Sequence, residues 1–283
     1  MAIVTADEVR DITGAPTDLI DDTTINNLIG SVEDKTKAKF NIVFTPKTKI
    51  ETLTGEYKDK ILLDEYFPLT AYKVVNGSTE IDLENIYVHT KEGFLEIYGE
   101  SVTGGGAYPY SGQRFSQYDL DVKVKYLYGA VERDTDNQTE ISVALTAGNA
   151  VSIEVADSSI FSDNDYAFIE DTNRAKEVFK ITSVDDTTHI TAEKLVNDYE
   201  SGALVSKAKT MELFKQFVLY ETGLAVGTSA VGSTYTFNTS YSLGALSTNK
   251  GVPYPHWEKN TQLCKQRRDE LLERINMLLA TII

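Results

Sequence analysis

The chain has 283 residues, enough for one large or two ordinary domains, and its 41% hydrophobic and 25% charged residues are typical of a globular protein with a sizeable core. We find no run of about 18 apolar residues and no basic start followed by an apolar stretch, so we expect neither a membrane span nor a secretory signal. The one cysteine, Cys264, excludes an intramolecular disulfide and a cysteine-based zinc site.

The formal net charge of −16 is unevenly distributed along the chain. Residues 1–132 and 133–208 each carry −9, whereas residues 209–283 carry +2. Affinity for nucleic acid comes from cations that displace counterions, so the acidic body argues against a protein that wraps nucleic acid. Such a charge remains compatible with DNA that passes through a channel without adhering to its wall.

The first predicted element is a short helix between Thr5 and Gly14. Thr5 and Glu8 have the spacing of a capping box, and Val4 and Val9 have the spacing of a hydrophobic staple. Gly14 supplies the left-handed residue that ends a helix. An isolated helix this short is unstable in water, so we expect it to pack on the rest of the chain.

A longer amphipathic helix follows, with Asp21 as its N-cap. The spacing of its apolar residues is close to 3.6, and they form one face directed at a core. This face consists of Ile25, Leu28, Ile29, Val32 and Phe40. The two helices together predict a helical hairpin.

From Lys49 the apolar pattern changes to a period of two, which is typical of strands. We predict a hairpin over residues 49–69 and a second one around Asn76-Gly77, the strongest short hairpin signal. Further strands are predicted at 85–89, 94–98 and 121–128. A Gly/Tyr-rich loop precedes the last of these strands and is expected to be exposed.

Residues 129–138 are polar and are interpreted as a linker to a β-rich module. The next 70 or so residues contain six short predicted strands, including two about the turn Asp185-Asp186, which favours a small barrel or sandwich. Helix then returns, with a predicted start at Thr210 and a predicted stop at Gly223.

A Gly/Ser/Thr-rich extended segment follows, and a final helix is predicted from about Pro255 almost to the end. One stripe of this helix is apolar and contains Cys264, Leu271, Ile275, Leu278 and Ile282. The predicted fold class is α+β. We expect residues 1–132 and 209–283 to form a helical core with a small β-section, and residues 136–207 to form an inserted all-β domain.

A search for catalytic or cofactor chemistry finds little. The three histidines, His89, His189 and His256, lie in different segments without metal-ligand spacing, and no GxSxG elbow is present. The GGGAY stretch lacks the lysine and the following helix of a phosphate loop, and residues 162–171 match a calcium loop at three positions alone. We therefore predict no catalytic residues, no metal and no cofactor, and a structural or binding role.

Three short motifs resemble the phage head-to-tail adaptor family, also called head–tail connector proteins. The family pattern has a first short helix, a second helix with an aspartate start, and a strand that ends in Tyr-x-x-Gly. The matching residues are Thr5, Glu8, Val9 and Arg10, then Asp22, Ile25, Leu28 and Ile29, then Val122, Val124, Tyr126 and Gly129. The resemblance covers residues 1–130 and, more weakly, 209–283. This chain departs from the pattern because the β-module displaces the helix expected after Gly129.

The resemblance implies a virion protein at the head–tail neck, assembled in the host cytoplasm. Such adaptors form a ring, usually of twelve copies, beneath the portal protein, extend the DNA channel and offer a docking platform to the tail or the next neck protein. It implies a portal interface in the C-terminal region, which we place on Tyr254, Trp257, Arg267, Arg268, Leu271 and Leu278. For contacts with a neighbouring subunit we select Asp7, Arg10 and Asp11.

Two other classes remain open. The chain is alternatively a β-rich binding module of a virion, such as a fibre, decoration or carbohydrate-binding protein, with the helices as its anchor. An enzyme is the third class, and it has no visible acid/base or nucleophile constellation in its favour.

Overall fold

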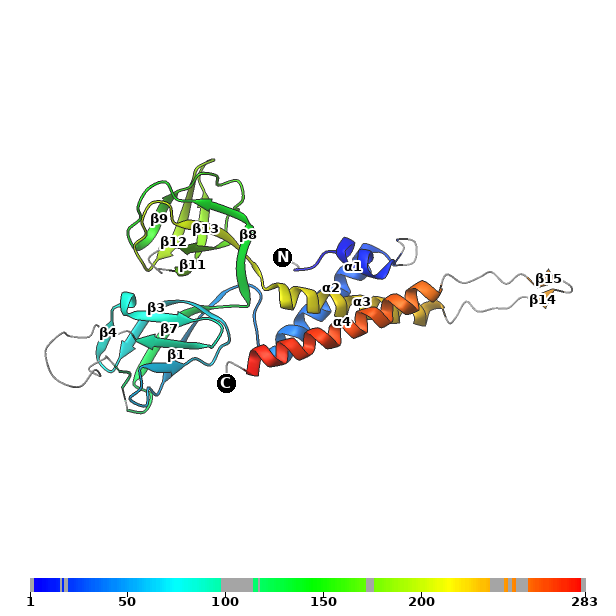
Figure 1. Cartoon of the computed structure of the whole chain (residues 1–283), viewed down its shortest axis with the longest axis horizontal. Coiled ribbons are helices and arrows are strands. Elements are labelled where there is room, and N and C mark those ends of the chain that lie inside the picture. The colour runs from blue at the N-terminus through cyan, green and yellow to red at the C-terminus, as the bar shows by residue number, and fades with distance from the viewer. Residues whose placement is uncertain are drawn as a thin grey trace. The chain divides into compact units, whose positions relative to one another are not determined.

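The computed structural model describes residues 3–15, 17, 20–97, 114–116, 118–171, 176–234, 242–243, 246–247 and 254–280. Side chains are described to residue 228 in the third helix and from residue 259 in the fourth. The chain divides into two compact units, Met1–Asn41 with Met211–Ala280, and Ile42–Thr210 (Figure 1). We call them the helical unit and the β unit. Over the residues described, no helix is long and apolar enough to cross a membrane.

The helical unit takes its helices from both ends of the chain. They are α1 (Ala6–Thr13), α2 (Asp22–Phe40), α3 (Glu212–Thr234) and α4 (Tyr254–Ala280). In the sequence between α3 and α4, β14 (Ser242–Leu243) and β15 (Leu246–Ser247) form a short antiparallel pair. Helices α3 and α4 lie side by side (Figure 1). Phe40 joins α2 to α3, because its ring centre lies 6.1 Å from that of Phe214 and 5.3 Å from that of Phe217.

The predicted caps of the first two helices are confirmed. The Thr5 hydroxyl accepts the backbone N–H of Glu8 at 3.2 Å, and the Glu8 carboxylate accepts the backbone N–H of Thr5 at 2.8 Å. Gly14 has a φ of +68° and its N–H donates to Arg10 O at 2.7 Å. The Asp21 carboxylate caps α2 by accepting the N–H of Thr24 at 2.7 Å. Local sequence therefore fixes both helix starts.

The predicted helix stop at Gly223 is wrong, because α3 continues through it to Thr234. A Cβ at this position would come within 2.8 Å of Cδ1 of Ile12 and 2.9 Å of Sγ of Cys264. A Cβ at Gly227 would meet Oγ1 of Thr261 at 2.2 Å. These glycines permit close packing between helices rather than helix termination.

The β unit begins with two small antiparallel sheets. The first has the strand order β1-β7-β3-β4 and the second has the order β2-β6-β5. Their strands are β1 (Lys47–Leu53), β2 (Lys60–Leu62), β3 (Pro68–Asn76), β4 (Thr79–Ile81), β5 (Ile86–His89), β6 (Phe94–Ile97) and β7 (Val122–Tyr128), with a 3-10 turn at Leu83–Asn85. Val122, Val124 and Tyr126 are fully buried on one face of β7, as the alternation predicts.

The hairpin at Asn76-Gly77 is confirmed, since β3 and β4 pair about it and Gly77 has a φ of +64°. The hairpin predicted over residues 49–69 is wrong. Strand β1 pairs with β7, whereas β2 pairs with β6 in the other sheet. Alternation identified both strands, but strand pairing depends on partners more than thirty residues away.

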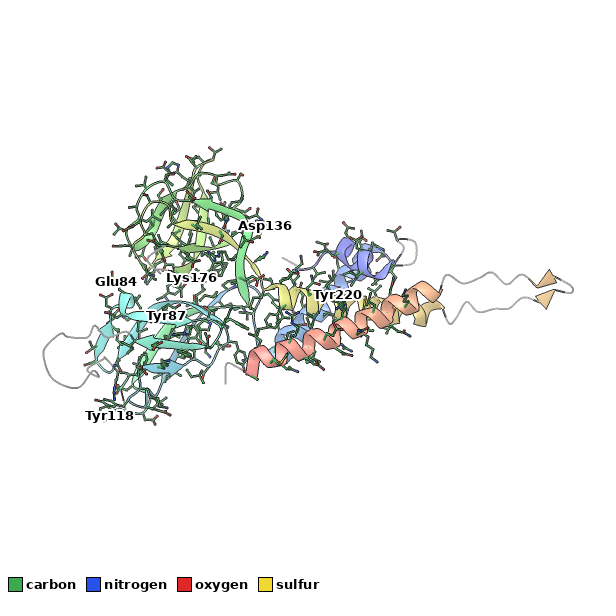
Figure 2. The ribbon with its side chains drawn as sticks, viewed as in Figure 1. Glu84, Tyr87, Tyr118, Asp136, Lys176 and Tyr220 are labelled. Carbon is green, nitrogen blue, oxygen red and sulfur yellow. The ribbon has the colours of Figure 1, made fainter. Side chains whose placement is uncertain are left out.

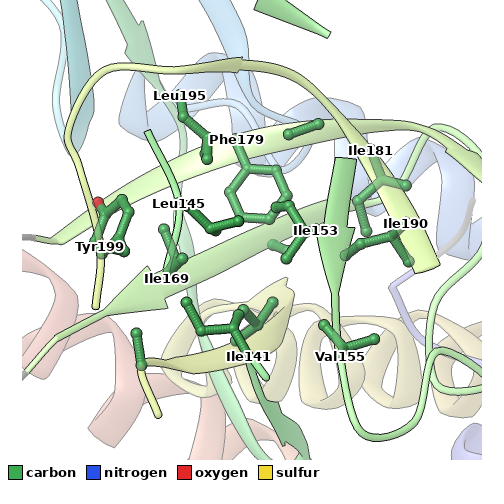
Figure 3. Packing of buried hydrophobic residues seen from close by; sticks show 14 of the residues in the cluster. Ile141, Leu145, Ile153, Val155, Ile169, Phe179, Ile181, Ile190, Leu195 and Tyr199 are labelled. Carbon is green, nitrogen blue, oxygen red and sulfur yellow. The ribbon is translucent and has the colours of Figure 1, made fainter. Parts of the chain in front are cut away.

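The third sheet has the order β8-β13-β10-β11-β12-β9. It encloses an apolar core that includes Phe179, Ile153 and Ile190 (Figure 3). Its strands are β8 (Val131–Glu140), β9 (Gly148–Glu154), β10 (Tyr166–Glu170), β11 (Lys176–Val184), β12 (His189–Leu195) and β13 (Leu204–Thr210).

Five strands of this sheet lie within the predicted module, whereas the sixth, β8, lies mostly in the linker predicted before it, and the sheet does not close a barrel. Its outer strands, β8 and β9, are linked by the bridge between Ile141 and Val155. The polar linker predicted at 129–138 is also wrong, because most of it belongs to β8, paired with β13. A charged outer strand lacks the alternation that marks a strand in sequence.

The predicted α+β fold class is confirmed. The division into compact units groups residues 42–132 with the six-stranded sheet. The predicted domains are a core of residues 1–132 and 209–283 and an inserted domain of residues 136–207. These boundaries concern which part of the chain folds by itself, and they stay a prediction.

Candidate functional site

The N-terminal helical hairpin is locked by one arginine. The Arg10 guanidinium donates to the backbone carbonyls of Ala15 at 3.0 Å and Ile20 at 2.8 Å. It also bonds the Asp22 carboxylate, with Nε 3.0 Å from Oδ1. The Arg10 side chain is 13% exposed, so it is directed at its own loop. We refer to these contacts as the Arg10 clasp, which ties the end of α1 to the start of α2.

The residues selected for subunit contacts therefore differ in exposure. Asp7 and Asp11 are exposed on α1, whereas Arg10 is engaged within the helical unit. A second intramolecular pair joins Glu8 to Lys215 at the start of α3, at 2.7 Å. The predicted contact role of all three residues stays a prediction.

The residues selected for the portal interface lie along α4. Arg268 pairs with Glu221 of α3 at 2.9 Å and Leu271 is buried, so both hold α4 to the helical unit. Arg267 is 54% exposed and forms an ion pair with Glu270 at 2.9 Å. Leu278 is half-buried. The side chains of Tyr254 and Trp257, in the first turn of α4, lie outside the described residues.

The other positions considered for chemistry have structural roles where they are described. Cys264 is buried against α3, and burial raises the pKa of its thiol. His89 bonds the Glu96 carboxylate at 2.7 Å, and His189 lies 3.0 Å from Asp186. Among the described residues no group of three or more potential ligands could hold a metal ion. The GGGAY stretch at 104–108 and the His256 side chain lie outside that set.

The calcium-like stretch is a structured turn. The Asp163 carboxylate accepts the N–H of Val184 at 2.8 Å, and Asp165 accepts the N–H of Ser162 at 2.9 Å. Asp165 also pairs with Lys207 at 2.6 Å. Both carboxylates are therefore engaged by groups of the protein itself.

A cavity of about 750 Å³ lies within the β unit. One wall is formed by β3, the 3-10 turn, β5 and the turn after β5; the other is formed by Phe168, the start of β11 and residues 196–198. Tyr87 and Glu84 belong to the first wall and Lys176 to the second (Figure 2). This volume is in the range of roughly 300–1,000 Å³ found for ligand pockets.

The walls meet at a pair of hydrogen bonds from one side chain. The Thr70 hydroxyl donates to the carbonyl of Val178 at 2.9 Å and accepts the N–H of Val178 at 2.7 Å. Leu69, Leu127 and Phe168 pack beside this pair in a buried apolar cluster. Because both backbone groups of Val178 are satisfied by one hydroxyl, β3 and β11 are fixed side by side without a strand ladder.

Glu177 lies at the cavity and is almost completely buried. Its carboxyl group accepts the N–H of Val196 at 3.0 and 2.9 Å, and Asn197 donates at 3.4 Å. Burial raises the pKa of Glu177 to about 8, because the hydrogen bonds, which lower the pKa, offset only part of the effect of desolvation. The roles of Thr70 and Glu177 were not predicted from the sequence, because neither residue belongs to a local motif.

No protein-family model matches the chain, and no curated protein matches it.

Proposed function

We propose that this chain is a structural virion protein, a head-to-tail adaptor that forms a ring beneath the portal. In that role it extends the DNA channel and gives the tail or the next neck component a docking platform. The observation that carries the proposal is the Arg10 clasp. Arg10 comes from the first motif of the adaptor pattern and Asp22 from the second, and the two residues act together. Two short matches in sequence therefore correspond to one structural device.

The third motif supports the proposal in the same way. Its residues Val122, Val124 and Tyr126 are fully buried in the sheet. At Gly129, which follows the strand, a Cβ would lie 3.1 Å from Cα of Pro46, so a larger residue would displace the backbone. The matching positions are thus those that the fold depends on, as expected of a family signature.

The helical unit offers exposed charged faces for contacts in a ring. Asp7 and Asp11 are exposed on α1, and Arg267 is exposed on α4. A closed ring needs a heterologous interface, in which one surface of each subunit meets a different surface of the next. Exposed carboxylates on α1 and an exposed guanidinium on α4 suit such an interface. The acidic body of the chain also suits a channel wall that repels DNA phosphate.

The test is assembly with the portal protein of the same virus. Purified chain is mixed with portal rings and observed by negative-stain electron microscopy, and we expect an added ring on one face of the portal. Arg267→Glu is expected to weaken this assembly, whereas Lys73→Glu serves as the matched control, because Lys73 is an exposed cation of the β unit that is likewise paired with a glutamate and lies outside the cavity. Portal rings that remain bare at saturating chain would contradict the proposal.

The cavity favours a second candidate, a β-rich binding module. Its volume of about 750 Å³ is typical of a ligand site, and its lining includes Tyr87, Lys176 and Asp198. If the chain is such a binding module, the labelled chain is expected to bind host cells; if it is an adaptor, it is not. Binding of the purified chain to host cells in the absence of other virion proteins therefore separates the two candidates.

A further inference from the structure

Strand β5 differs from the other outer strands of the three sheets in the described β unit. The outer strands are β1, β4, β2, β5, β8 and β9. Each of the other five carries at least one charged side chain, such as Lys49 in β1, Lys60 in β2 or Glu154 in β9. Charged residues on an outer strand oppose pairing with another chain. The β5 sequence, Ile-Tyr-Val-His, has no lysine, arginine, aspartate, glutamate or proline.

The free edge of β5 lies beside the cavity. All four residues of β5 line the cavity, and β5 pairs with β6 on its other side. The side chain of His89 is held on the sheet, since it bonds Glu96 and its ring stacks on Phe94 with 4.0 Å between ring centres. Tyr87 is 46% exposed, which is high for a large aromatic side chain. An outer strand without charged side chains or proline thus lies next to a cavity.

The remaining lining indicates what would fill this space. The opposite wall presents the half-buried Val196, and the cavity also contains Glu84 and Glu92 near the two ends of β5. Glu84 is exposed and the Glu92 side chain is 52% exposed, so both carboxylates are accessible. Glu177 is engaged with Val196, and its pKa of about 8 leaves it mostly uncharged at neutral pH. The other three carboxylates of the lining stand against two ammonium groups. The chemistry suits an extended apolar segment with a cation at each end.

We propose that the cavity receives an extended peptide segment of a partner protein, which adds as a strand to the free edge of β5 and carries lysine or arginine at its ends. Main-chain hydrogen bonds to β5 supply affinity in this mode of recognition, and alternate side chains supply specificity. The alternate apolar side chains contact Tyr87 and Val196, and the terminal cations pair with Glu84 and Glu92. The inference is independent of the adaptor proposal, because a monomeric full chain suffices for binding.

The test uses a fluorescein-labelled hexapeptide, Lys-Val-Thr-Val-Thr-Lys, and the full chain in solution. We expect saturable binding by fluorescence anisotropy with a Kd on the order of 100 µM. A second peptide, Lys-Val-Pro-Val-Pro-Lys, keeps the charges and apolar residues but loses two backbone donors. It is expected to bind at least about tenfold more weakly, because strand addition depends on main-chain hydrogen bonds.

Protein variants locate the site. The double variant Glu84→Lys with Glu92→Lys is expected to weaken the first peptide about tenfold through charge repulsion. The matched control, Glu80→Lys with Glu140→Lys, makes the same change of charge at exposed positions outside the cavity and is expected to leave Kd unchanged.

Three results would overturn the inference. They are no saturable binding below about 2 mM, equal binding of the proline peptide, or equal weakening by both double variants. Circular dichroism of each variant checks that the fold is retained. None of these results bears on ring formation with the portal, so the two proposals fail separately.

Discussion

Removal of the Arg10 guanidinium separates a scaffold role from a role in subunit contacts. In Arg10→Ala the carbonyls of Ala15 and Ile20 lose their donors, and both hydrogen bonds are partly buried. A hydrogen bond to a charged group contributes about 1.5–3 kcal/mol, and a buried acceptor left unpaired costs about 1–3 kcal/mol. The ion pair adds little, because the Asp22 side chain is 63% exposed. We therefore expect the free energy of unfolding of the helical unit to fall by about 2–4 kcal/mol.

Urea unfolding followed by circular dichroism at the helix band measures this change. All four α-helices of the described residues belong to the helical unit, so the helical signal reports on it. With a slope near 2 kcal/mol per molar, the midpoint is expected to fall by about 1–2 M. Arg267→Ala is the control, since that side chain is 54% exposed and its pair with Glu270 is expected to contribute less than about 0.5 kcal/mol. Equal midpoints for Arg10→Ala and the unmodified chain would refute the scaffold role of the clasp.

Four further substitutions test interactions within each of the two units. Gly227→Ala is expected to destabilise the helical unit by about 1–3 kcal/mol, because its Cβ would overlap the Thr261 side chain. Gly30→Ala, where an added Cβ meets nothing within 4 Å, is expected to stabilise α2 by about 0.5–1 kcal/mol in the same urea experiment. Thr70→Val is expected to lower the thermal midpoint of the β unit by removing two hydrogen bonds worth about 1–3 kcal/mol together, and an unchanged midpoint would show that they contribute nothing. The unfolded chain loses the Glu177 proton near the ordinary pKa of 4.5, whereas the folded chain loses it near 8. The free energy of unfolding is therefore expected to fall as the pH rises from 4.5 to 8, by up to roughly 1.4 kcal/mol per pH unit. Glu177→Gln should remove this slope, which urea titrations at several pH values measure.

The elements that sequence predicted correctly are those with local causes. The start of α1 is fixed by Thr5 and Glu8, three residues apart, and the start of α2 by Asp21 and the N–H of Thr24. Alternation along β7 predicted its buried face, because side chains in a strand point to opposite sides of the sheet. These signals require no knowledge of the rest of the chain.

The predictions that failed depend on distant partners. Gly223 has the local signature of a helix stop, but Ile12 and Cys264 determine that a glycine is needed within α3. The edge strand β8 was interpreted as a linker because its charged residues mask the strand pattern. Thr70 contacts Val178 across 108 positions, and no local pattern reveals such a contact. The candidate sites are affected in the same way, since the cavity is assembled from segments that lie far apart in the sequence.

The most direct test of the central claim is a cryo-electron microscopy reconstruction of the neck of virions that carry this chain. The account predicts a ring of density directly beneath the portal into which the helical unit fits, with α1 at the contact between neighbouring copies. Density for the chain elsewhere on the virion, with none beneath the portal, would contradict the adaptor proposal.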